Sequence, residues 1–115
     1  MTGSDVKITL VTPVFNGAKY LEEMLESLRG QRYSNLEYIV CDGGSTDGTL
    51  EILRSNSDLI SQLIVGKDRG MYDAINKGFS LAQGEVLGWI NADDLLLPWC
   101  LRCVAEYFKA VPECE

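Results

Sequence analysis

The stretch KITLVTPVFNGAKYLEEMLESLRG, residues 7–30, joins a predicted strand to a predicted helix and sets the pattern for the rest of the chain. Its first part, Lys7–Val14, is apolar and β-branched, which favours a strand. Asn16-Gly17 breaks that strand, and Asn16 is positioned to cap a helix. Apolar residues then recur at helical spacing from Tyr20 to Leu28, and Gly30 ends the helix.

The same unit recurs three more times. Further strands are predicted at residues 36–41, 59–65 and 85–90, and further helices at 50–53, 71–82 and about 98–110. This alternation favours an α/β fold in which a mostly parallel sheet carries helices on both faces. Right-handed crossovers place the carboxyl ends of all strands at one edge of the sheet. We expect a single domain over residues 1–115.

Composition restricts the class of protein. With 115 residues, 46% of them hydrophobic, the chain suffices for one modest core. The net charge of −7 argues against nucleic acid as a partner, but not against a nucleotide held through a metal ion. Because no apolar run has the length of a membrane span and the N-terminus lacks the pattern of a secretory signal, we expect a cytoplasmic protein. Attachment to the inner face of the membrane stays open.

The cysteines are Cys41, Cys100, Cys103 and Cys114. Cys100 and Cys103 have the spacing of a zinc or redox pair, but zinc needs a second pair, and a redox pair usually begins a helix just after a strand. Because both fall inside the last predicted helix, we expect Cys100 to face inward as a small hydrophobic side chain, and the same placement is open for Cys103.

Polar residues collect where the predicted strands end, and parallel α/β sheets bind ligands along that edge. Each has a simpler explanation when taken alone: a turn, a surface charge or, for Tyr72, a core contact at helical spacing. Their shared edge favours a ligand site. The residues that fall there are Thr12, Pro13, Phe15, Asn16, Asp42, Gly43, Gly44, Lys67, Asp68, Arg69, Gly70, Asn91, Asp93 and Asp94.

The adjacent carboxylates Asp93 and Asp94 lie between apolar segments and repel each other. A Mg²⁺ or Mn²⁺ ion shared with a phosphorylated ligand would relieve this repulsion. The alternative is a solvated acidic turn in which one aspartate caps the last helix.

With these residues in view, the chain resembles the family-two glycosyltransferases, which have the GT-A fold. The resemblance is carried by ITLVTPVFNGAKYLEEMLESLRGQRYSNLEYIVCDGGSTDGT, residues 8–49, and by KDRGMYDAINKGFSLAQGEVLGWINADD, residues 67–94, which ends in the family's Asp-x-Asp region. Asn91 and Gly43 stand where many members carry aspartate. The resemblance implies the Rossmann-like, nucleotide-binding half of a GT-A fold.

The resemblance also implies a site for a nucleotide-diphosphate sugar and a bound Mg²⁺ or Mn²⁺. It places Asp42 at the base, Asp93 at the ribose and metal, and Asp94 as the metal ligand. The nucleotide-binding residues that it implies are Thr12, Pro13, Asp42, Arg69, Tyr72, Asn76 and Asp93.

The activity implied is metal-assisted, inverting transfer of a sugar to a hydroxyl of a glycan, lipid-linked or other acceptor, in the synthesis of cell-surface or extracellular glycans. In this family the catalytic base follows the Asp-x-Asp region, so we expect a donor-binding portion truncated at the C-terminus, weak or inactive alone, with no base assigned. The alternatives are a nucleotide- and metal-binding module without turnover, or a nucleotidyltransferase-like enzyme. A homodimer through an exposed sheet edge is a further expectation.

Overall fold

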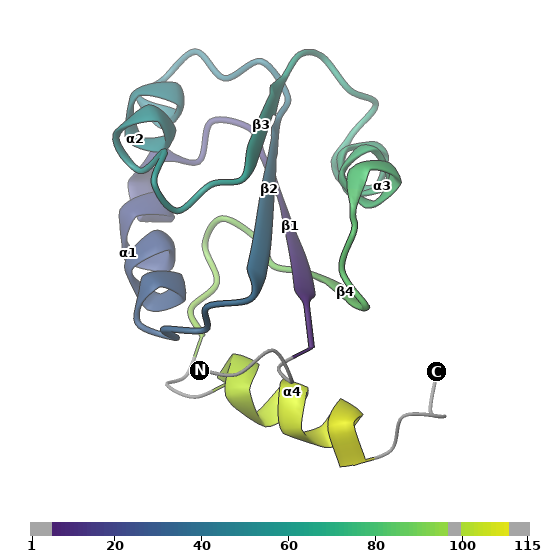
Figure 1. Ribbon diagram of the computed structural model, residues 1–115. Coiled ribbons are helices and arrows are strands. Elements are labelled where there is room, and N and C mark those ends of the chain that lie inside the picture. Colours follow the sequence, from purple (N-terminus) through teal and green to yellow (C-terminus); the bar gives the residue numbers. More distant parts are fainter. Residues whose placement is uncertain (1–5, 97–99, 111–115) are drawn as a thin grey trace.

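A computed structural model of the protein describes residues 6–96 and 100–110 and confirms the predicted alternation (Figure 1). The third strand begins three residues later than the predicted residue 59, because a turn, in which the Leu59 amide donates to the Asn56 carbonyl, extends the end of the second helix. The elements are β1 (Ile8–Val14), α1 (Ala18–Arg29), β2 (Leu36–Asp42), α2 (Thr49–Ser55), β3 (Gln62–Val65), α3 (Met71–Leu81), β4 (Val86–Trp89) and α4 (Cys100–Ala110).

The strands form one parallel sheet in the order β3-β2-β1-β4. Val14 at the end of β1 pairs with Asp42 at the end of β2, and Asp42 pairs with Val65 at the end of β3. Trp89, at the end of β4, pairs with Val11, so β4 ends three residues earlier along β1. The predicted α/β class is therefore confirmed, and all the strand ends share one edge.

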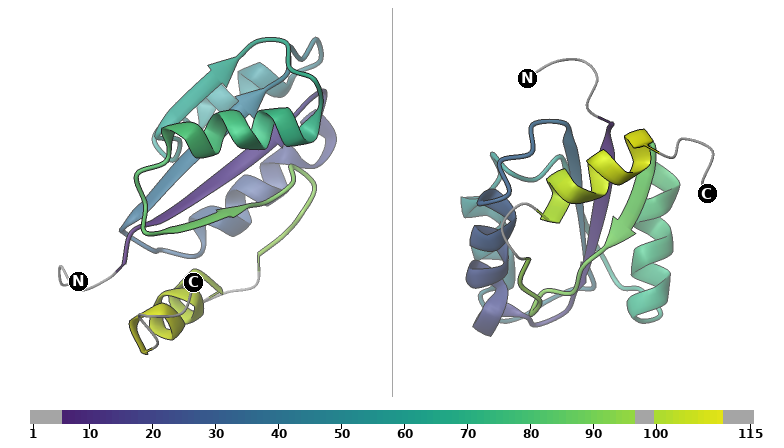
Figure 2. Two further views of the ribbon diagram at one scale, coloured as in Figure 1. Left: turned by 90° about the vertical axis from the view of Figure 1, so that its right-hand side faces the viewer. Right: turned by 90° about the horizontal axis from the view of Figure 1, so that it is seen from below.

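Helices cover both faces of the sheet, as predicted. Helices α1 and α2 lie on one face, and α3 lies on the other (Figures 1 and 2). Helix α4 lies near the opposite end of the sheet from the shared edge, where the Leu101 amide donates to Oε1 of Gln31 over 2.9 Å. No helix within residues 6–96 and 100–110 combines the length and hydropathy required to cross a bilayer.

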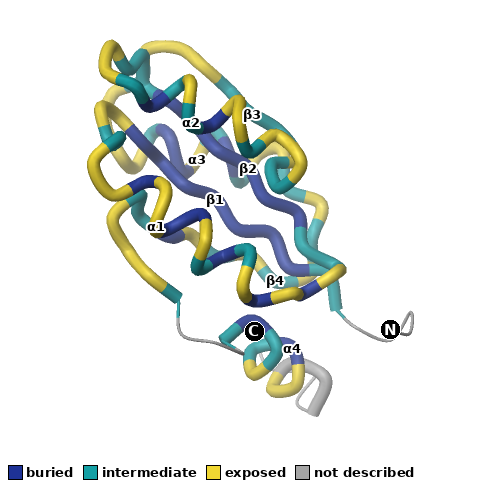
Figure 3. Tube along the Cα trace, turned by 90° about the vertical axis from the view of Figure 1, so that its left-hand side faces the viewer, coloured by how far each residue is buried: buried dark blue, intermediate teal, exposed yellow. Residues whose placement is uncertain are grey.

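The hydrophobic core is divided by the sheet, whose central strands are buried along their length (Figure 3). The larger part lies beneath α1 and α2, and the smaller part beneath α3. The larger part includes Ile8, Leu21, Met24, Leu25, Leu28 and Tyr38, and the smaller part includes Val11, Ile39, Cys41 and Ala74.

Two predictions about inward-facing residues need correction. Tyr72 is 73% exposed, because α3 turns the small residues Ala74 and Gly78 toward the sheet. Cys100 is half-buried, whereas Cys103 is exposed rather than part of the core. Cys114 lies outside the described residues.

Candidate functional site

Two adjoining cavities open at the carboxyl edge of the sheet. One, of about 540 Å³, lies between the strand ends and α3 and is lined in part by Gly43, Asp68 and Ala74. The other, of about 530 Å³, lies between the end of β1, the start of α1 and the segment after β4. Both are lined by Pro13, Val14, Phe15 and Met71, so the two cavities adjoin, and we refer to them together as the cleft.

Asp42 is the most unusual group at this edge. It is only 1% exposed, and its Oδ1 accepts hydrogen bonds from the amides of Gly44 (2.8 Å) and Ser45 (2.7 Å). Its Oδ2 is buried, and no group in the described residues donates to it. Native proteins rarely leave a buried carboxylate oxygen unpaired, because its desolvation is not compensated. Asp42 itself lines neither cavity, but the next residue, Gly43, lines the first, so the buried oxygen lies behind the wall of that cavity.

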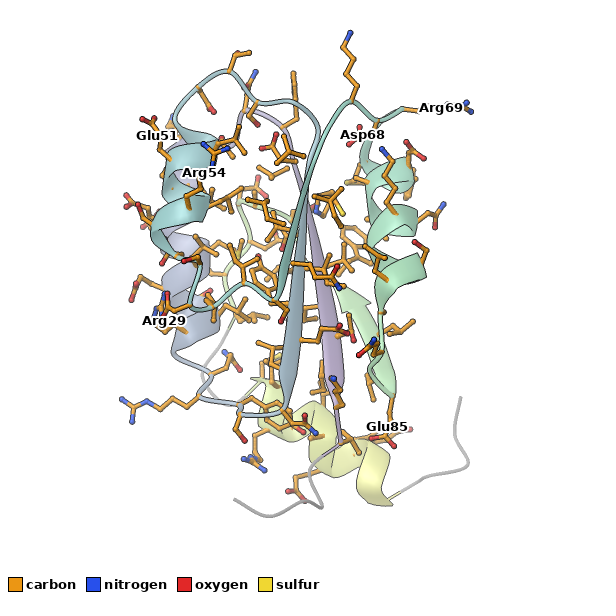
Figure 4. The ribbon with its side chains drawn as sticks, turned by 45° about the horizontal axis from the view of Figure 1, so that its top comes forward. Arg29, Glu51, Arg54, Asp68, Arg69 and Glu85 are labelled. Atoms are coloured by element: carbon orange, nitrogen blue, oxygen red, sulfur yellow. The ribbon has the colours of Figure 1, made fainter. Side chains whose placement is uncertain are left out.

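The side chain of Asp68 lies where a side chain at position 43 would be. Its Oδ1 accepts from the Gly70 amide over 3.0 Å, and a Cβ atom on Gly43 would lie 3.1 Å from its Oδ2. Figure 4 shows the side chain of Asp68 between β3 and α3, with Arg69 pointing away from the molecule. The absence of a side chain at position 43 thus leaves room for the Asp68 carboxylate at the wall of the cavity.

The segment that carries Asp68 is held against α3. Oδ2 of Asp73 accepts from the Arg69 amide over 2.9 Å, and Nζ of Lys77 donates to the Lys67 carbonyl over 3.1 Å. Lys67 also lines the first cavity, so a basic and an acidic residue adjoin at this wall.

The nucleotide-binding residues implied by the resemblance occupy different environments. Pro13 lines both cavities, but Thr12 is buried, and its hydroxyl lies 2.6 Å from the Tyr38 hydroxyl. Burial raises the pKa of Tyr38 well above its usual value, so this pair is a neutral hydrogen bond within the core. The Thr12 hydroxyl is therefore bonded within the core rather than directed at the cleft. Arg69, Tyr72 and Asn76 are exposed and line neither cavity.

Asp93 and Asp94 are both exposed but line different cavities. Asp93 lines the second cavity of the cleft. Oδ2 of Asp94 accepts from the Asn91 amide over 3.1 Å, and Asp94 lines a separate apolar groove between β4 and α4.

These positions bear on metal binding. No group of three or more histidine, cysteine, aspartate or glutamate side chains in the described part of the chain is arranged to hold a metal. Magnesium sites often use only one or two protein carboxylates and take their other oxygens from phosphate and water. Asp93 lies at the second cavity and Asp94 at a separate groove, so these two carboxylates do not form a metal site by themselves.

Sequence reasoning placed Phe15, Lys67 and Asp68 at the edge but gave them no role. Phe15 is 64% exposed and lines both cavities, although large aromatic side chains are usually at least partly buried. An aromatic residue directly after a strand that ends at the ligand-binding edge was the available signal.

Comparison with known proteins agrees with this geometry. The profile of a family described as Glycosyl transferase family 2 matches residues 9–113. A glycosyltransferase of Rickettsia typhi is 36% identical over 91 residues, which cover 79% of this chain and 28% of the relative. Chondroitin synthase of Escherichia coli is 33% identical over 106 residues, which cover 89% of this chain and 15% of the relative.

Solved structures are also similar. S. aureus TarS 1–349 in complex with UDP-GlcNAc superposes with a TM-score of 0.84 and 26% identity, over 90% of this chain and 31% of that one. Mannosyltransferase PcManGT from Pyrobaculum calidifontis in complex with GDP-Man and Mn²⁺ gives a TM-score of 0.74 and 29% identity. The superposition covers 83% of this chain and 30% of the mannosyltransferase. The chain spans less than a third of the length of each of these proteins.

Proposed function

The chain belongs to glycosyl transferase family 2, and from this premise we propose that it forms the donor site of an enzyme that transfers a sugar from a nucleoside-diphosphate sugar to an acceptor hydroxyl. The similar structures of TarS with UDP-GlcNAc and PcManGT with GDP-Man support a nucleotide sugar as the donor. The parallel sheet supports the same assignment, because such sheets bind nucleotides at their carboxyl edge.

The unpaired Oδ2 of Asp42 is the observation that carries the proposal. An N–H group of a nucleobase in the first cavity would satisfy this oxygen and remove the penalty of leaving it buried and unpaired. Phe15, exposed at the junction of the cavities, offers a flat ring on which a base can stack.

The second cavity is suited to the ribose and the diphosphate. Asp93 lines it, and we assign this carboxylate to the ribose and to a Mg²⁺ or Mn²⁺ ion. Asp94, the metal ligand that the resemblance implies, lines the groove between β4 and α4 and would have to turn toward the second cavity to bind the same ion. When bound, such an ion offsets the charge that develops on the departing nucleoside diphosphate. The Mn²⁺ in the PcManGT complex supports this assignment.

Transfer requires a general base for the acceptor hydroxyl, and we assign that role to none of the described residues. Inversion at the sugar carbon and a role in building cell-surface or extracellular glycans are parts of the proposal. The similarity to chondroitin synthase supports a polysaccharide product.

Isothermal calorimetry with UDP and with GDP, each with and without Mn²⁺, tests the donor site. We expect wild-type protein to bind at least one of them, and Asp42→Asn to weaken that binding about tenfold or more, because a hydrogen bond to a charged group contributes about 1.5–3 kcal/mol. Asparagine keeps the Oδ1 acceptor for Gly44 and Ser45 but places a donor where Oδ2 was. Asp58→Asn, which removes the same charge from the exposed turn beside Arg29, is the control and should not change binding.

Binding of neither nucleotide by the wild type, or equal binding by Asp42→Asn, would contradict the proposal. Release of nucleoside diphosphate from UDP-GlcNAc or GDP-mannose would exclude a binding module. We expect this chain alone to release little or none, because the base is assigned to none of its described residues.

A further inference from the structure

We propose that Asn16 and Asp47 are positioning residues, which join the loops after β1 and β2 and thereby hold the carboxylate of Asp42 in its orientation toward the donor. This inference rests on the proposed donor site. Asn16 lines the second cavity, but the role proposed here requires no contact of either side chain with the nucleotide, because both act through the backbone of residues 43–49.

Asn16 binds the second loop through both its backbone and its side chain. Its amide donates to Oγ of Ser45 over 2.8 Å. Its Oδ1 accepts from the amide of Thr46 over 2.8 Å and from that of Asp47 over 3.4 Å. The loops are neighbours because β1 pairs with β2 along their full lengths, up to Val14 and Asp42.

Asp47 also joins the two loops, here with a side chain from the loop after β2 that binds the backbone at the start of α1. Its Oδ2 accepts from the Ala18 amide at the start of α1 over 3.2 Å, and its Oδ1 accepts from the amide of Thr49 over 2.9 Å and also from its hydroxyl. Oγ1 of Thr49 in turn accepts from the Gly17 amide over 3.0 Å. The Thr49 hydroxyl, followed by the backbone amides, lowers the pKa of Asp47 despite the opposing effect of desolvation, so the carboxylate is ionised at neutral pH.

Ser45 connects this network to the donor site. Its hydroxyl accepts from Asn16, and its own amide donates to Oδ1 of Asp42. A continuous series of hydrogen bonds therefore runs from the first residues of α1 to Asp42. With Oδ1 held by the loop, the orientation of the carboxylate is fixed, and with it the position of the unpaired Oδ2.

The backbone of Asn16 indicates that this arrangement is maintained against a local penalty. Its φ is 52°, in the left-handed region that residues other than glycine adopt at a cost, although asparagine does so more readily than most. The hydrogen bonds made by Asn16 offset that penalty. Asn16 itself lines the second cavity, and it follows Phe15, which lines both cavities.

Asn16→Gly tests the inference, because glycine accepts the left-handed conformation and removes only the side-chain acceptor. We expect this variant to keep its unfolding temperature within a few degrees and to bind the preferred nucleotide, UDP or GDP, about tenfold more weakly. Asn16→Asp, which keeps an acceptor oxygen, should bind within about threefold of wild type. Asp47→Asn should weaken binding like Asn16→Gly, because it presents a donor to the Ala18 amide.

A double-mutant cycle separates positioning from a general structural role. If Asn16 acts through Asp42, Asn16→Gly should change binding little in the Asp42→Asn background, whereas independent effects would multiply. The inference would be overturned if wild type bound a nucleotide and Asn16→Gly bound it with the same affinity. It would also be overturned if the losses of affinity from Asn16→Gly and Asp42→Asn multiplied in the double mutant. Either result would leave the proposed donor site intact. Failure of the wild type to bind either nucleotide would overturn both.

Discussion

A Cβ atom on Gly78 would lie 2.4 Å from Cγ1 of Val11, so α3 packs against β1 more closely than a residue with a side chain allows. Gly78 is fully within the helix and buried. Ala74, one turn earlier, lines the first cavity of the cleft. The contact between a glycine and a valine thus sets the position of one wall of the proposed donor site.

We expect Gly78→Ala to destabilise the protein by about 1–3 kcal/mol, because the new methyl group overlaps Val11. The sign of the change in the free energy of unfolding is informative, because alanine in place of glycine stabilises a helix without such a contact by up to about 1 kcal/mol. Urea denaturation measures the change. Gly30→Ala is the matched control, because its Cβ would meet only ordinary contacts, the nearest at 3.4 Å, and the change should be close to zero or stabilising. A more stable Gly78→Ala protein would show that α3 is not packed this closely.

A buried network at the other end of the sheet predicts a dependence of stability on pH. Oε1 of Glu37 accepts from the Thr9 hydroxyl (2.7 Å) and the Gln83 amide (2.8 Å), and the Thr9 hydroxyl oxygen accepts from the Gly84 amide (2.9 Å). Burial raises the pKa of Glu37, but these hydrogen bonds and the charge of Lys7 outweigh it, so the net pKa lies below its ordinary value of 4.5.

Because the folded pKa is lowered, the stabilisation from ionised Glu37 is complete above that ordinary value and is lost as the pH falls through the folded pKa. We expect Glu37→Gln to destabilise the protein by about 1–2 kcal/mol near neutral pH, with the difference from wild type shrinking in acid. Guanidinium denaturation at a series of pH values measures it. Glu22→Gln, which removes a charge from the exposed face of α1, controls for net charge. A difference that is constant with pH would contradict the prediction.

Phe15→Ala should separate binding from stability. Because Phe15 is 64% exposed, its loss should change the free energy of unfolding by no more than about 0.5 kcal/mol. Loss of a stacking surface should weaken nucleotide binding about tenfold, since stacking contributes about 1–3 kcal/mol per base. Tyr107→Ala on α4, where the side chain is 54% exposed, is the control for removing an aromatic ring. Unchanged affinity on calorimetry would exclude Phe15 from the site.

The outer edge of β4 predicts self-association. Within the described residues β4 pairs only with β1, and Leu87 and Trp89 on it are 47% and 44% exposed. An open, apolar edge strand is a template for pairing with a second copy. We expect Leu87→Lys to reduce dimer formation in sedimentation velocity runs over a range of concentrations. Leu81→Lys, the same change on α3, should have less effect; a wild type that stays monomeric throughout would contradict the expectation.

The order and type of the secondary-structure elements were predictable, because strand and helix periodicities are local properties. The face of α3 that meets the sheet was predictable only in part. Helical spacing favoured an inward face through Tyr72, Ile75 and Phe79. Ile75 is buried and Phe79 packs against the smaller part of the core, but Tyr72 is exposed. The structure also turns Ala74 and Gly78 toward the sheet. Small residues allow the closest approach of α3 to β1, and a pattern of hydrophobic residues does not reflect side-chain size.

The candidate site divides in the same way. Local patterns were enough to bring Asp42, Lys67, Asp68 and Asp93 to one edge, because parallel strands with right-handed connections must end together. Packing alone determined that Thr12 is bonded to Tyr38 and that Asp93 and Asp94 line different cavities. It also determined that Asn16 reaches an amide 30 residues away and that one oxygen of Asp42 stays unpaired. Hydrogen bonds between distant loops form only once the strands beneath them are paired, so no local pattern in the chain records them.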